Sequence, residues 1–465
     1  MNHIREILRR RQSYEPIDAQ GEAQPLRVEA LDEVGFQSGY RDDEDEQSLE
    51  PDEEFSWANY AVFLLLGVAM LWAWNMFIAS GPYFKKRFQA NEWVLQNFQP
   101  AELVASTTSN LSAVLIFANL QAKASYSRRV VVGLLLNSVV FTLLAMSTKL
   151  FLHVSSGQYF AFIIVQVLFA SFATGILQNG LFAYASGFGR EEYTQAIMAG
   201  QAVAGVLPAM VQIVSVLSVP ESTTVTYDPE ESSTSALIYF ITATAISLIT
   251  LLAFFPLVMR HYRSQHRQNL STSIMSMEGS MLIEAERKRV PLLVLFRKTF
   301  WLATSLFLGF GITMVFPVFT QKIFSVRDPG TAGRLFKNET FVPLALLFWN
   351  AGDLIGRMLP AIHALRTMDK PRLVFFIAIS RVAFIPLYLM CNIEGHGAVI
   401  SSDFFYLVVV QLLFGISNGF IGTTCMMGAV EYVEPEEREA AGAFMGLCLV
   451  SGLAAGSLMS FLVAG

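Results

Sequence analysis

The sequence predicts an all-α membrane protein with eleven membrane-spanning helices. Of its 465 residues, 53% are hydrophobic and only 15% are charged, whereas soluble domains have roughly 25% charged residues. A spanning helix needs about 20 mostly apolar residues, and most of the chain's long stretches without Asp, Glu, Lys or Arg meet that length. The hydrophobic core of a soluble protein does not require so many long uncharged stretches. The uncharged stretches are 103–122, 130–148, 154–189, 193–220, 232–259, 299–321, 404–430 and 440–465.

The spans divide the chain into an acidic tail, two halves and a basic connection. Residues 1–55 are polar and cannot bury enough apolar surface to fold, so we expect a disordered acidic tail in the cytosol. Residues 57–259 hold spans one to six, 260–298 form a basic cytosolic loop, and 299–465 hold spans seven to eleven. The predicted spans lie near 57–80, 101–122, 129–149, 156–187, 193–219, 235–259, 299–321, 340–365, 372–393, 403–430 and 440–463.

The distribution of Lys and Arg predicts the orientation, since cytosolic loops are enriched in them. With the N-terminus in the cytosol, the cytosolic loops hold 16 of these residues and the opposite loops hold 8. The run Lys85-Lys86-Arg87 on the outer side is the exception. An odd number of spans then places the C-terminus outside the cell or in a lumen.

A repeat suggests that the two halves have the same architecture. Three sets of residues recur six spans later, at separations of 239, 235 and 240 residues: Asn179-Gly180 with Asn418-Gly419, Pro82-Tyr83-Phe84 with Pro317-Val318-Phe319, and Asn110 with Asn350. Each pair is weak evidence alone, but their shared offset favours a duplicated transporter with its binding site between the halves.

The eighth span carries an acid and a base inside the predicted bilayer. Asp353 and Arg357 stand four residues apart, which places them on one helix face. Asn350 shares that face. An ionisable group at this depth costs about 2.5–3.5 kcal/mol or more, so it is expected to face a cavity or a partner. Alternatively, the pair neutralises itself and serves only in helix packing.

Polar and aromatic residues in the first and fourth spans are further candidates. The Trp74 ring is able to stack on a flat solute while its N–H donates a hydrogen bond, but tryptophan is equally common as an interfacial anchor. Gln178 lies deep in an uncharged stretch. Its amide pairs a donor with an acceptor and suits the edge of a nucleobase, although amides in membranes more often join helices.

Nothing in the sequence favours an enzyme. Cys391, Cys425 and Cys448 have neither disulfide nor metal-site spacing. The six His residues fall in loops, in the tail or at span ends, without a paired metal motif. We therefore expect no catalytic residues, no metal or other cofactor and no nucleic-acid partner.

Several motifs together resemble the equilibrative nucleoside transporter family, also called solute carrier family 29. The resemblance covers nearly everything from residue 57 onward, in the family's order and with its eleven spans. The resembling segments are Trp74-Asn75-Met76-Phe77, Pro82-Tyr83-Phe84, Leu177-Gln178 through Leu181-Phe182, Glu192-Tyr193-Thr194 through Gln201, Asn350-x-x-Asp353-x-x-Gly356-Arg357, Arg381 through Leu387, Ser417-Asn418-Gly419 and Glu439-Ala440-Ala441-Gly442.

The resemblance implies a fold like that of the major facilitator superfamily, with one helix fewer and two pseudo-repeated halves. It implies transport of nucleosides, or nucleobases, by alternating access, either down their gradient or with protons. The expected partners are a nucleoside and the bilayer, and the expected state is monomeric. The expected location is a plasma membrane or a vacuolar or lysosomal-type membrane. A facilitator-type carrier of another small polar solute is the alternative.

The resemblance also implies site residues. The base would lie against the indole of Trp74 and the aliphatic side chains of Leu71 and Ile78. The amide of Gln178 would bind the edge of the base. The charged pair, Asp353 and Arg357, would bind the ribose and the ring with the help of Asn350. Four further residues match gate or conformational positions of the family: Arg129, Glu439, Gly200 and Gly205.

Three substitutions depart from the family pattern. Ala73 replaces the usual Pro before Trp74, Thr174 stands where a Gly is common, and Asn179-Gly180 replaces a Gly-Ser pair. None of them removes a residue expected to contact substrate. They leave the preference for purine or pyrimidine open.

Overall fold

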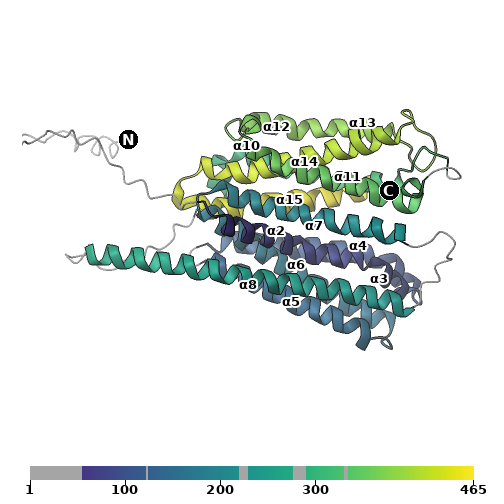
Figure 1. Ribbon diagram of the computed structural model, residues 1–465, viewed down its shortest axis with the longest axis horizontal. Helices are drawn as coiled ribbons and strands as arrows, with labels where there is room; N and C mark the ends of the chain where they lie inside the picture. Colours follow the sequence, from purple (N-terminus) through teal and green to yellow (C-terminus); the bar gives the residue numbers. More distant parts are fainter. Residues whose placement is uncertain (1–54, 122–123, 219–228, 276–289, 329–332, 465) are drawn as a thin grey trace, which may run out of the picture. The chain divides into compact units, whose positions relative to one another are not determined.

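Long helices run side by side through the part of the chain that the structure describes (Figure 1). The computed structural model describes residues 55–121, 124–218, 229–275, 290–328 and 333–464. Within these residues the secondary structure is helical apart from one antiparallel bridge between Ile323 and Ile393. Of the predicted acidic tail, only Phe55 belongs to the described residues.

The helices of the first half occupy one side of the bundle and those of the second half the other (Figure 1). The first half contains α2 (Trp57–Ala79), α3 (Gly81–Phe88), α4 (Glu92–Asn119), α5 (Tyr126–Leu150), α6 (Ser156–Gly187), α7 (Glu191–Ser218) and α8 (Pro229–Met275). The second half contains α9 (Leu292–Lys298), α10 (Phe300–Lys322), α11 (Asn338–Met358), α12 (Pro371–Ser380), α13 (Phe384–Leu389), the π-helix η6 (Phe405–Leu412) with α14 (Leu413–Gly428), and α15 (Arg438–Ala464).

Short 3-10 turns link the helices of the second half. They are η2 (Arg334–Phe336), η3 (Leu359–Ala361), η4 (His363–Leu365), η5 (Arg381–Ala383), η7 (Ala429–Tyr432) and η8 (Pro435–Glu437). The turn η5 lies between α12 and α13, so it interrupts the α-helix within the ninth predicted span.

The structure confirms the helical membrane architecture but not the number eleven. Ten helical segments within the described residues are long and apolar enough to cross a bilayer. The predicted eighth span corresponds to α11, which is not among the ten. Its 21 residues include Asn350, Asp353 and Arg357, so the side chains that make it a candidate site also reduce its hydropathy.

Helix α8 extends beyond the predicted sixth span. It continues to Met275, and α9 covers Leu292–Lys298, so both ends of the segment expected to be a loop, 260–298, are helical. The reason is local: between Pro256 and the end of α8 there is no proline or glycine to end the helix. Residues 276–289 of that segment lie outside the described residues.

Helix packing repeats between the halves. In the first half α2 packs on α7 and α4 on α6; in the second, α10 packs on α15 and α11 on α14. Each second-half helix lies six spans after its counterpart. Gly175 of α6 contacts the Asn110 carbonyl of α4, and Gly415 of α14 contacts the Trp349 carbonyl of α11. The two glycines are 240 residues apart, which matches the predicted offset.

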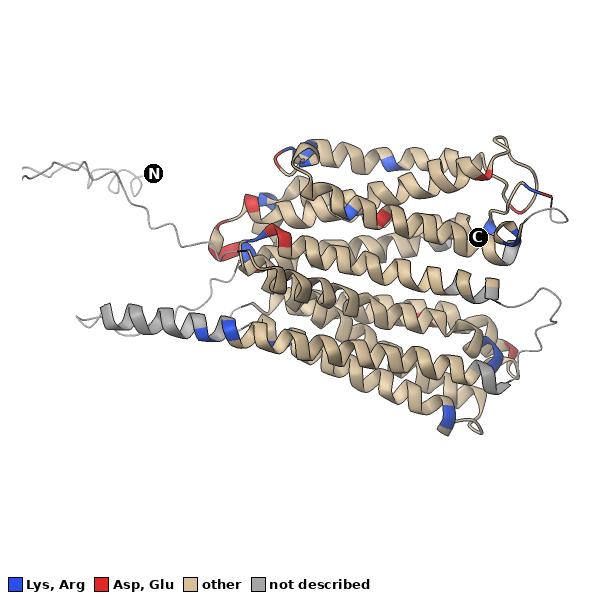
Figure 2. Cartoon of the chain, viewed as in Figure 1, with Lys and Arg blue, Asp and Glu red and all other residues tan. Residues whose placement is uncertain are grey.

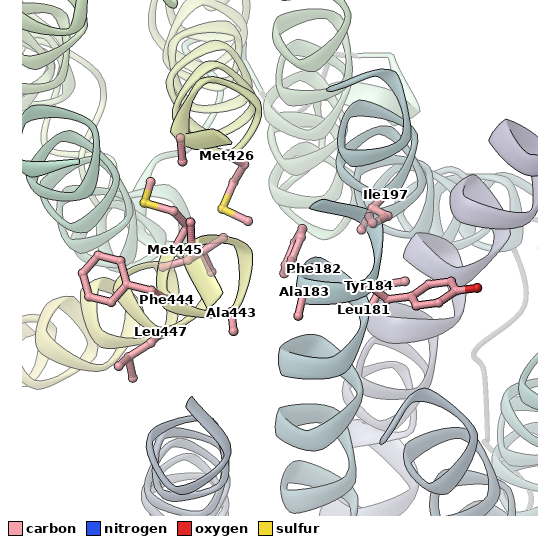
Figure 3. Packing of buried hydrophobic residues seen from close by; sticks show 14 of the residues in the cluster. Leu181, Phe182, Ala183, Tyr184, Ile197, Met426, Ala443, Phe444, Met445 and Leu447 are labelled. Carbon is pink, nitrogen blue, oxygen red and sulfur yellow. The ribbon is translucent and has the colours of Figure 1, made fainter. Parts of the chain in front are cut away.

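The halves meet along α6 with α15 and along α7 with α11. A large apolar cluster crosses the first of these contacts and includes Phe182 and Ala183 of α6 and Ala443 and Met445 of α15 (Figure 3). Ala and Gly on α15 permit this close approach. For example, a Cβ on Gly442 would lie 2.9 Å from the Cβ of Ser186.

Charged residues gather at the two ends of the bundle and are rare along its middle (Figure 2). Arg87 in α3 belongs to the basic run that disagrees with the predicted orientation. It donates to the carbonyls of Phe151 (2.8 Å) and Val154 (2.5 Å), beyond the end of α5, and lies over the Tyr159 ring. Arg87 therefore has a local structural role, which reduces its weight as an orientation signal.

A testable consequence concerns the contact between α2 and α7. A Cβ on Gly200 would overlap the Leu64 carbonyl oxygen and lie 2.8 Å from the Val68 nitrogen. We expect Gly200→Ala to lower the free energy of unfolding by about 1–3 kcal/mol, the usual effect of overpacking. Thermal unfolding of the purified protein measures it. Gly157→Ala, where an added Cβ meets nothing within 4 Å, is the control; equal stability of the two variants would contradict the packing.

Candidate functional site

Glycines of α14 hold the charged segment of α11 against that helix. A Cβ on Gly415 would lie 2.9 Å from the Asp353 nitrogen, and one on Gly419 would lie 2.8 Å from the Arg357 nitrogen. Without side chains at these positions, the two backbones lie nearly in contact. Asn418, which precedes Gly419, thereby reaches the charged pair.

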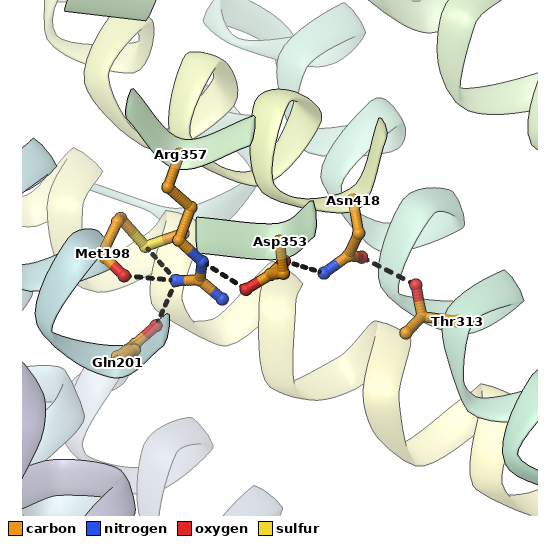
Figure 4. Close-up of polar contacts among 6 residues, drawn as sticks. All are labelled: Met198, Gln201, Thr313, Asp353, Arg357 and Asn418. Carbon is orange, nitrogen blue, oxygen red and sulfur yellow. Dashed lines mark hydrogen bonds and ion pairs between the residues drawn. The ribbon is translucent and has the colours of Figure 1, made fainter. Parts of the chain in front are cut away.

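Asp353 and Arg357 form a buried ion pair. Arg357 Nε donates to Asp353 Oδ2 at 2.7 Å, and Asn418 Nδ2 donates to Asp353 Oδ1 at 2.6 Å (Figure 4). Asp353 is 4% exposed and Arg357 is 5% exposed. Breaking such a pair leaves an uncompensated buried charge, which typically destabilises a protein by about 3–5 kcal/mol. Both charges therefore depend on their partners.

The pair faces the first half of the protein rather than the outer surface of the bundle. Arg357 Nη1 donates to the Met198 carbonyl (2.8 Å) and to Gln201 Oε1 (2.9 Å), both in α7 (Figure 4). Gln201 in turn lies beside the sulfur of Met70 in α2, with its Nε2 at 3.9 Å. The ion pair thus occupies the boundary between the halves, where a transporter of two repeats has its binding site.

Further polar residues extend the network away from the first half. Thr313 Oγ1 in α10 donates to Asn418 Oδ1 at 2.7 Å. Arg381, at the break between α12 and α13, donates through Nη2 to Thr313 Oγ1 at 2.9 Å. It is 1% exposed. The network therefore runs from α7 through α11, α14 and α10 to η5.

Trp74 lines a small cavity within the first half, between α2, α5 and α6. The cavity has a volume of about 20 Å³, which is room for about one water molecule. Ala73 and Thr174, two of the departures from the family pattern, also line it. Both residues therefore help to set the size of the space beside Trp74. Gln166 lies there too, and its buried Oε1 accepts no hydrogen bond from the described residues.

Gln178 is buried on the face of α6 that turns towards the second half. Thr174, Gln178, Phe182 and Ser186 follow one another at four-residue spacing and share a helix face. Thr174 lines the Trp74 cavity, whereas an added Cβ on Gly442 of α15 would touch Ser186. Gln178 stands between these two contacts, although it does not itself line the cavity.

The remaining predicted substrate residues are less closely grouped. Leu71 is partly buried and Ile78 is 55% exposed; neither lines the cavity beside Trp74. Asn350 donates to the Leu346 carbonyl of its own helix at 2.9 Å. A Cβ on Gly205 of α7 would lie 2.5 Å from Asn350 Oδ1, so Gly205 makes room for this side chain at the boundary between the halves.

The predicted gate residues both lie beside α6. Arg129 in α5 donates to Asn179 Oδ1 at 2.5 Å and to the carbonyls of Phe117 and Leu120. The Glu439 carboxylate of α15 lies next to Gly187, where an added Cβ would be 3.0 Å from Glu439 Oε1. The role of Arg129 and Glu439 as gate residues stays a prediction.

One link between the halves was not predicted from the sequence. Arg366, in the connection between α11 and α12, pairs with Glu191 at the start of α7 (2.6 Å) and with Glu431 after α14 (2.7 Å). Glu191 belongs to the first half and the other two residues to the second. The pairs are partly exposed, so each contributes about 0–1 kcal/mol.

Sequence reasoning also missed the partners of the ion pair. Met198, Gln201, Asn418 and Thr313 come from three helices other than α11. Asn418 carried a signal, because it is a polar residue in an apolar span, but the sequence singled it out only as a repeat of Asn179 and as part of a family motif. Within the described residues no three His, Cys, Asp or Glu side chains come close enough to hold a metal ion.

Comparison with known structures supports the fold. FucP, a major facilitator superfamily transporter in the outward conformation, aligns with a TM-score of 0.53 and 14% identity, covering 87% of this chain and 91% of FucP. The proton:xylose symporter XylE aligns with a TM-score of 0.56 and 12% identity, covering 87% of each chain. The major-facilitator-like fold expected from the sequence is confirmed.

Comparison of sequences identifies the family. A model described as "Nucleoside transporter" matches residues 163–464. Nucleoside transporter FUN26 of Saccharomyces cerevisiae is 30% identical over 446 residues, covering 87% of this chain and 83% of the yeast protein. Equilibrative nucleoside transporter 1 of Rattus norvegicus is 29% identical over 469 residues, covering 90% and 98%. The chain is therefore an integral membrane protein that belongs to the nucleoside transporter family.

Proposed function

We propose that this protein carries nucleosides across a membrane, down their concentration gradient, by alternating access of one site between its two halves. The observation that carries the proposal is the buried pair of Asp353 and Arg357, which bonds to both halves at their boundary. The family and the relatives' names support nucleosides as the substrate class.

The ion pair has bonding capacity left for a ribonucleoside. Each Asp353 oxygen accepts one hydrogen bond within the described part of the chain, whereas a carboxylate offers about four acceptor sites. Two vicinal ribose hydroxyls are able to donate to the remaining ones. Arg357 Nη2 donates no hydrogen bond to the described residues, so it is available for an acceptor atom of the solute.

Residues of the first half would bind the base. Trp74 offers an aromatic face, and its ring stacks with Phe77 at 6.1 Å between centroids. Gln178 offers a donor and an acceptor from the face of α6 that turns towards α15. With the ribose bound by α11 and the base by α2 and α6, one nucleoside would bridge both halves. Leu71, Ile78 and Asn350 are proposed as further contacts of the site.

Alternating access requires contacts between the halves that break and re-form. The glycine-lined contact of α6 with α15 and the ion pairs of Arg366 lie where α6 ends and α7 begins. We propose that this side faces the cytosol and that Arg129, Glu439, Gly200 and Gly205 act there or in the adjoining helices. Weak, partly exposed ion pairs suit a gate, since they are readily broken.

The proposal also covers the orientation of the protein, its membrane and its oligomeric state. The N-terminus would lie in the cytosol and the C-terminus outside the cell or in a lumen, in a plasma membrane or a vacuolar or lysosomal-type membrane. The monomer would suffice for transport. Radiolabelled nucleoside uptake into proteoliposomes that contain only this chain tests the function; uptake of another small polar solute in place of nucleosides would favour the alternative substrate class.

Substitution of the buried carboxylate tests the site. We expect Asp353→Asn to reduce uridine or adenosine uptake roughly tenfold or more, because a hydrogen bond to a charged group contributes about 1.5–3 kcal/mol. Arg357→Ala is expected to act in the same way. Asp369→Asn, at an exposed position, is the matched control. Wild-type uptake by correctly inserted Asp353→Asn protein would remove Asp353 from the site.

A disulfide between the halves tests alternating access. An added Cβ on Gly187 would lie 3.0 Å from Glu439 Cγ, so Cys residues at both positions are close enough to form a disulfide. We expect oxidation of this double variant to stop uptake and reduction to restore it, with each single variant as control. A maleimide cross-link between Glu191→Cys and Arg366→Cys is expected to give the same block. Transport that continues through the cross-linked protein would argue against alternating access.

A protonophore separates facilitated diffusion from proton coupling. For transport down the nucleoside gradient, we expect initial uptake into proteoliposomes to be the same with and without an imposed proton gradient. Uptake at pH 5.5 and pH 7.5, with and without protonophore, provides the measurement. Accumulation above equilibrium that collapses on adding the protonophore would instead show that protons drive the transport.

A further inference from the structure

Arg381 is the largest fully buried side chain in the part of the chain that the structure describes, although it lies within a predicted span. Its Nη1 donates to the Gly309 carbonyl at 2.5 Å, its Nη2 to Thr313 Oγ1 at 2.9 Å, and its Nε to Ser417 Oγ at 3.1 Å. The guanidinium also lies 4.3 Å from the centre of the Phe414 ring. A buried cation needs such partners, but these partners also lead towards the proposed site.

The hydrogen bonds of Thr313 have a direction that Arg381 decides. A hydroxyl has one proton to donate, and Thr313 Oγ1 lies near two acceptors, the Gly309 carbonyl (2.8 Å) and Asn418 Oδ1 (2.7 Å). Arg381 already donates to that carbonyl and to the hydroxyl oxygen itself. Arg381 thereby favours donation of the Thr313 proton to Asn418.

The direction continues through Asn418 to the carboxylate. With Oδ1 accepting from Thr313, the amide must turn its Nδ2 towards Asp353, to whose Oδ1 it donates at 2.6 Å. An arginine only donates and an ionised carboxylate only accepts. The four side chains therefore form a chain of hydrogen bonds with a single direction, from Arg381 to Asp353.

We propose that Arg381 is a positioning residue for substrate: through Thr313 and Asn418 it fixes one oxygen of Asp353, so that the remaining acceptor sites of that carboxylate face the ribose hydroxyls. This inference rests on the proposed function. It adds that the preference for ribonucleosides over 2′,3′-dideoxynucleosides depends on a residue that makes no contact with the 2′- and 3′-hydroxyls.

A purely structural role for Arg381 has different consequences. Loss of stability would reduce the amount of active protein and thus the maximal rate for every nucleoside. Loss of carboxylate positioning would instead raise KM for uridine and leave KM for 2′,3′-dideoxyuridine almost unaffected, because the second solute lacks the vicinal 2′- and 3′-hydroxyls that Asp353 is proposed to bind. The ratio of the two transport efficiencies separates the two roles.

The chain offers a matched pair of threonines for this test. Thr313 and Thr320 are both buried in α10 and seven residues apart. We call the chain of hydrogen bonds from Arg381 through Thr313 and Asn418 to Asp353 the relay. Thr320 Oγ1 accepts from Gln411 Nε2 at 2.9 Å and does not belong to this relay. Thr313→Val breaks the relay, Thr313→Ser retains its hydroxyl, and Thr320→Val makes the same chemical change outside it.

The experiment measures uptake of uridine and of 2′,3′-dideoxyuridine into proteoliposomes, with protein amount and thermal stability checked for each variant. We expect Thr313→Val to lower the uridine-to-dideoxyuridine ratio of Vmax/KM by roughly fivefold, the size of one hydrogen bond, through KM. Thr313→Ser and Thr320→Val should keep the wild-type ratio. Arg381→Lys retains the charge but loses the planar fork of donors, so it should lower the ratio as well. This variant replaces Thr313→Val in the test if Thr313→Val does not fold. An unchanged ratio in the folded relay variants overturns the inference, whereas a wild-type protein without nucleoside uptake overturns the proposed function.

Discussion

A pair of opposite charges inside a bilayer needs bonding partners within the protein, and this requirement organises the centre of the molecule. Asp353 and Arg357 neutralise each other, yet each has further hydrogen-bonding atoms that lipid is unable to satisfy. Asn418 supplies a partner from α14, and Met198 and Gln201 supply partners from α7. The ion pair therefore belongs to neither half alone, and any relative movement of α7 and α11 must change its bonds.

Close backbone contacts make this arrangement possible. Glycines of α14 bring that helix against the segment of α11 that holds the pair. In the first half, glycines of α2 and α7 bring these two helices into close backbone contact. The halves themselves meet through an apolar cluster between α6 and α15, the buried bonds of Arg357 and the partly exposed ion pairs of Arg366. Two repeated halves that share one boundary are suited to alternate between two arrangements around one site.

The network also suggests how selectivity and stability are combined. Arg381 has hydrogen bonds to α10 and α14 from a position where the ninth span changes from α-helix to a 3-10 turn. From this turn the guanidinium reaches acceptors on two neighbouring helices. A residue that stabilises the second half in this way is also connected to the carboxylate that we propose binds ribose, so the two properties share the same hydrogen bonds.

The sequence by itself determined the class of the protein and the identity of its central charges. Length and absence of charge in the spans predict membrane helices because the thickness of the bilayer sets their length, and the spacing of Asp353 and Arg357 places both on one helix face. Motifs at an offset of about 240 residues predicted the two halves, whose repeated packing the structure shows.

Only the tertiary structure decided which side chains from distant helices meet those charges. Gln201 and Arg357 are 156 residues apart and Asn418 and Asp353 are 65 apart, and no periodicity within one helix specifies such pairs. Their meeting depends on the rotation and separation of packed helices, which glycine contacts such as Gly415 and Gly419 set. For the same reason the bridging role of Arg366 and the direction of the Arg381 relay follow from the packed structure alone.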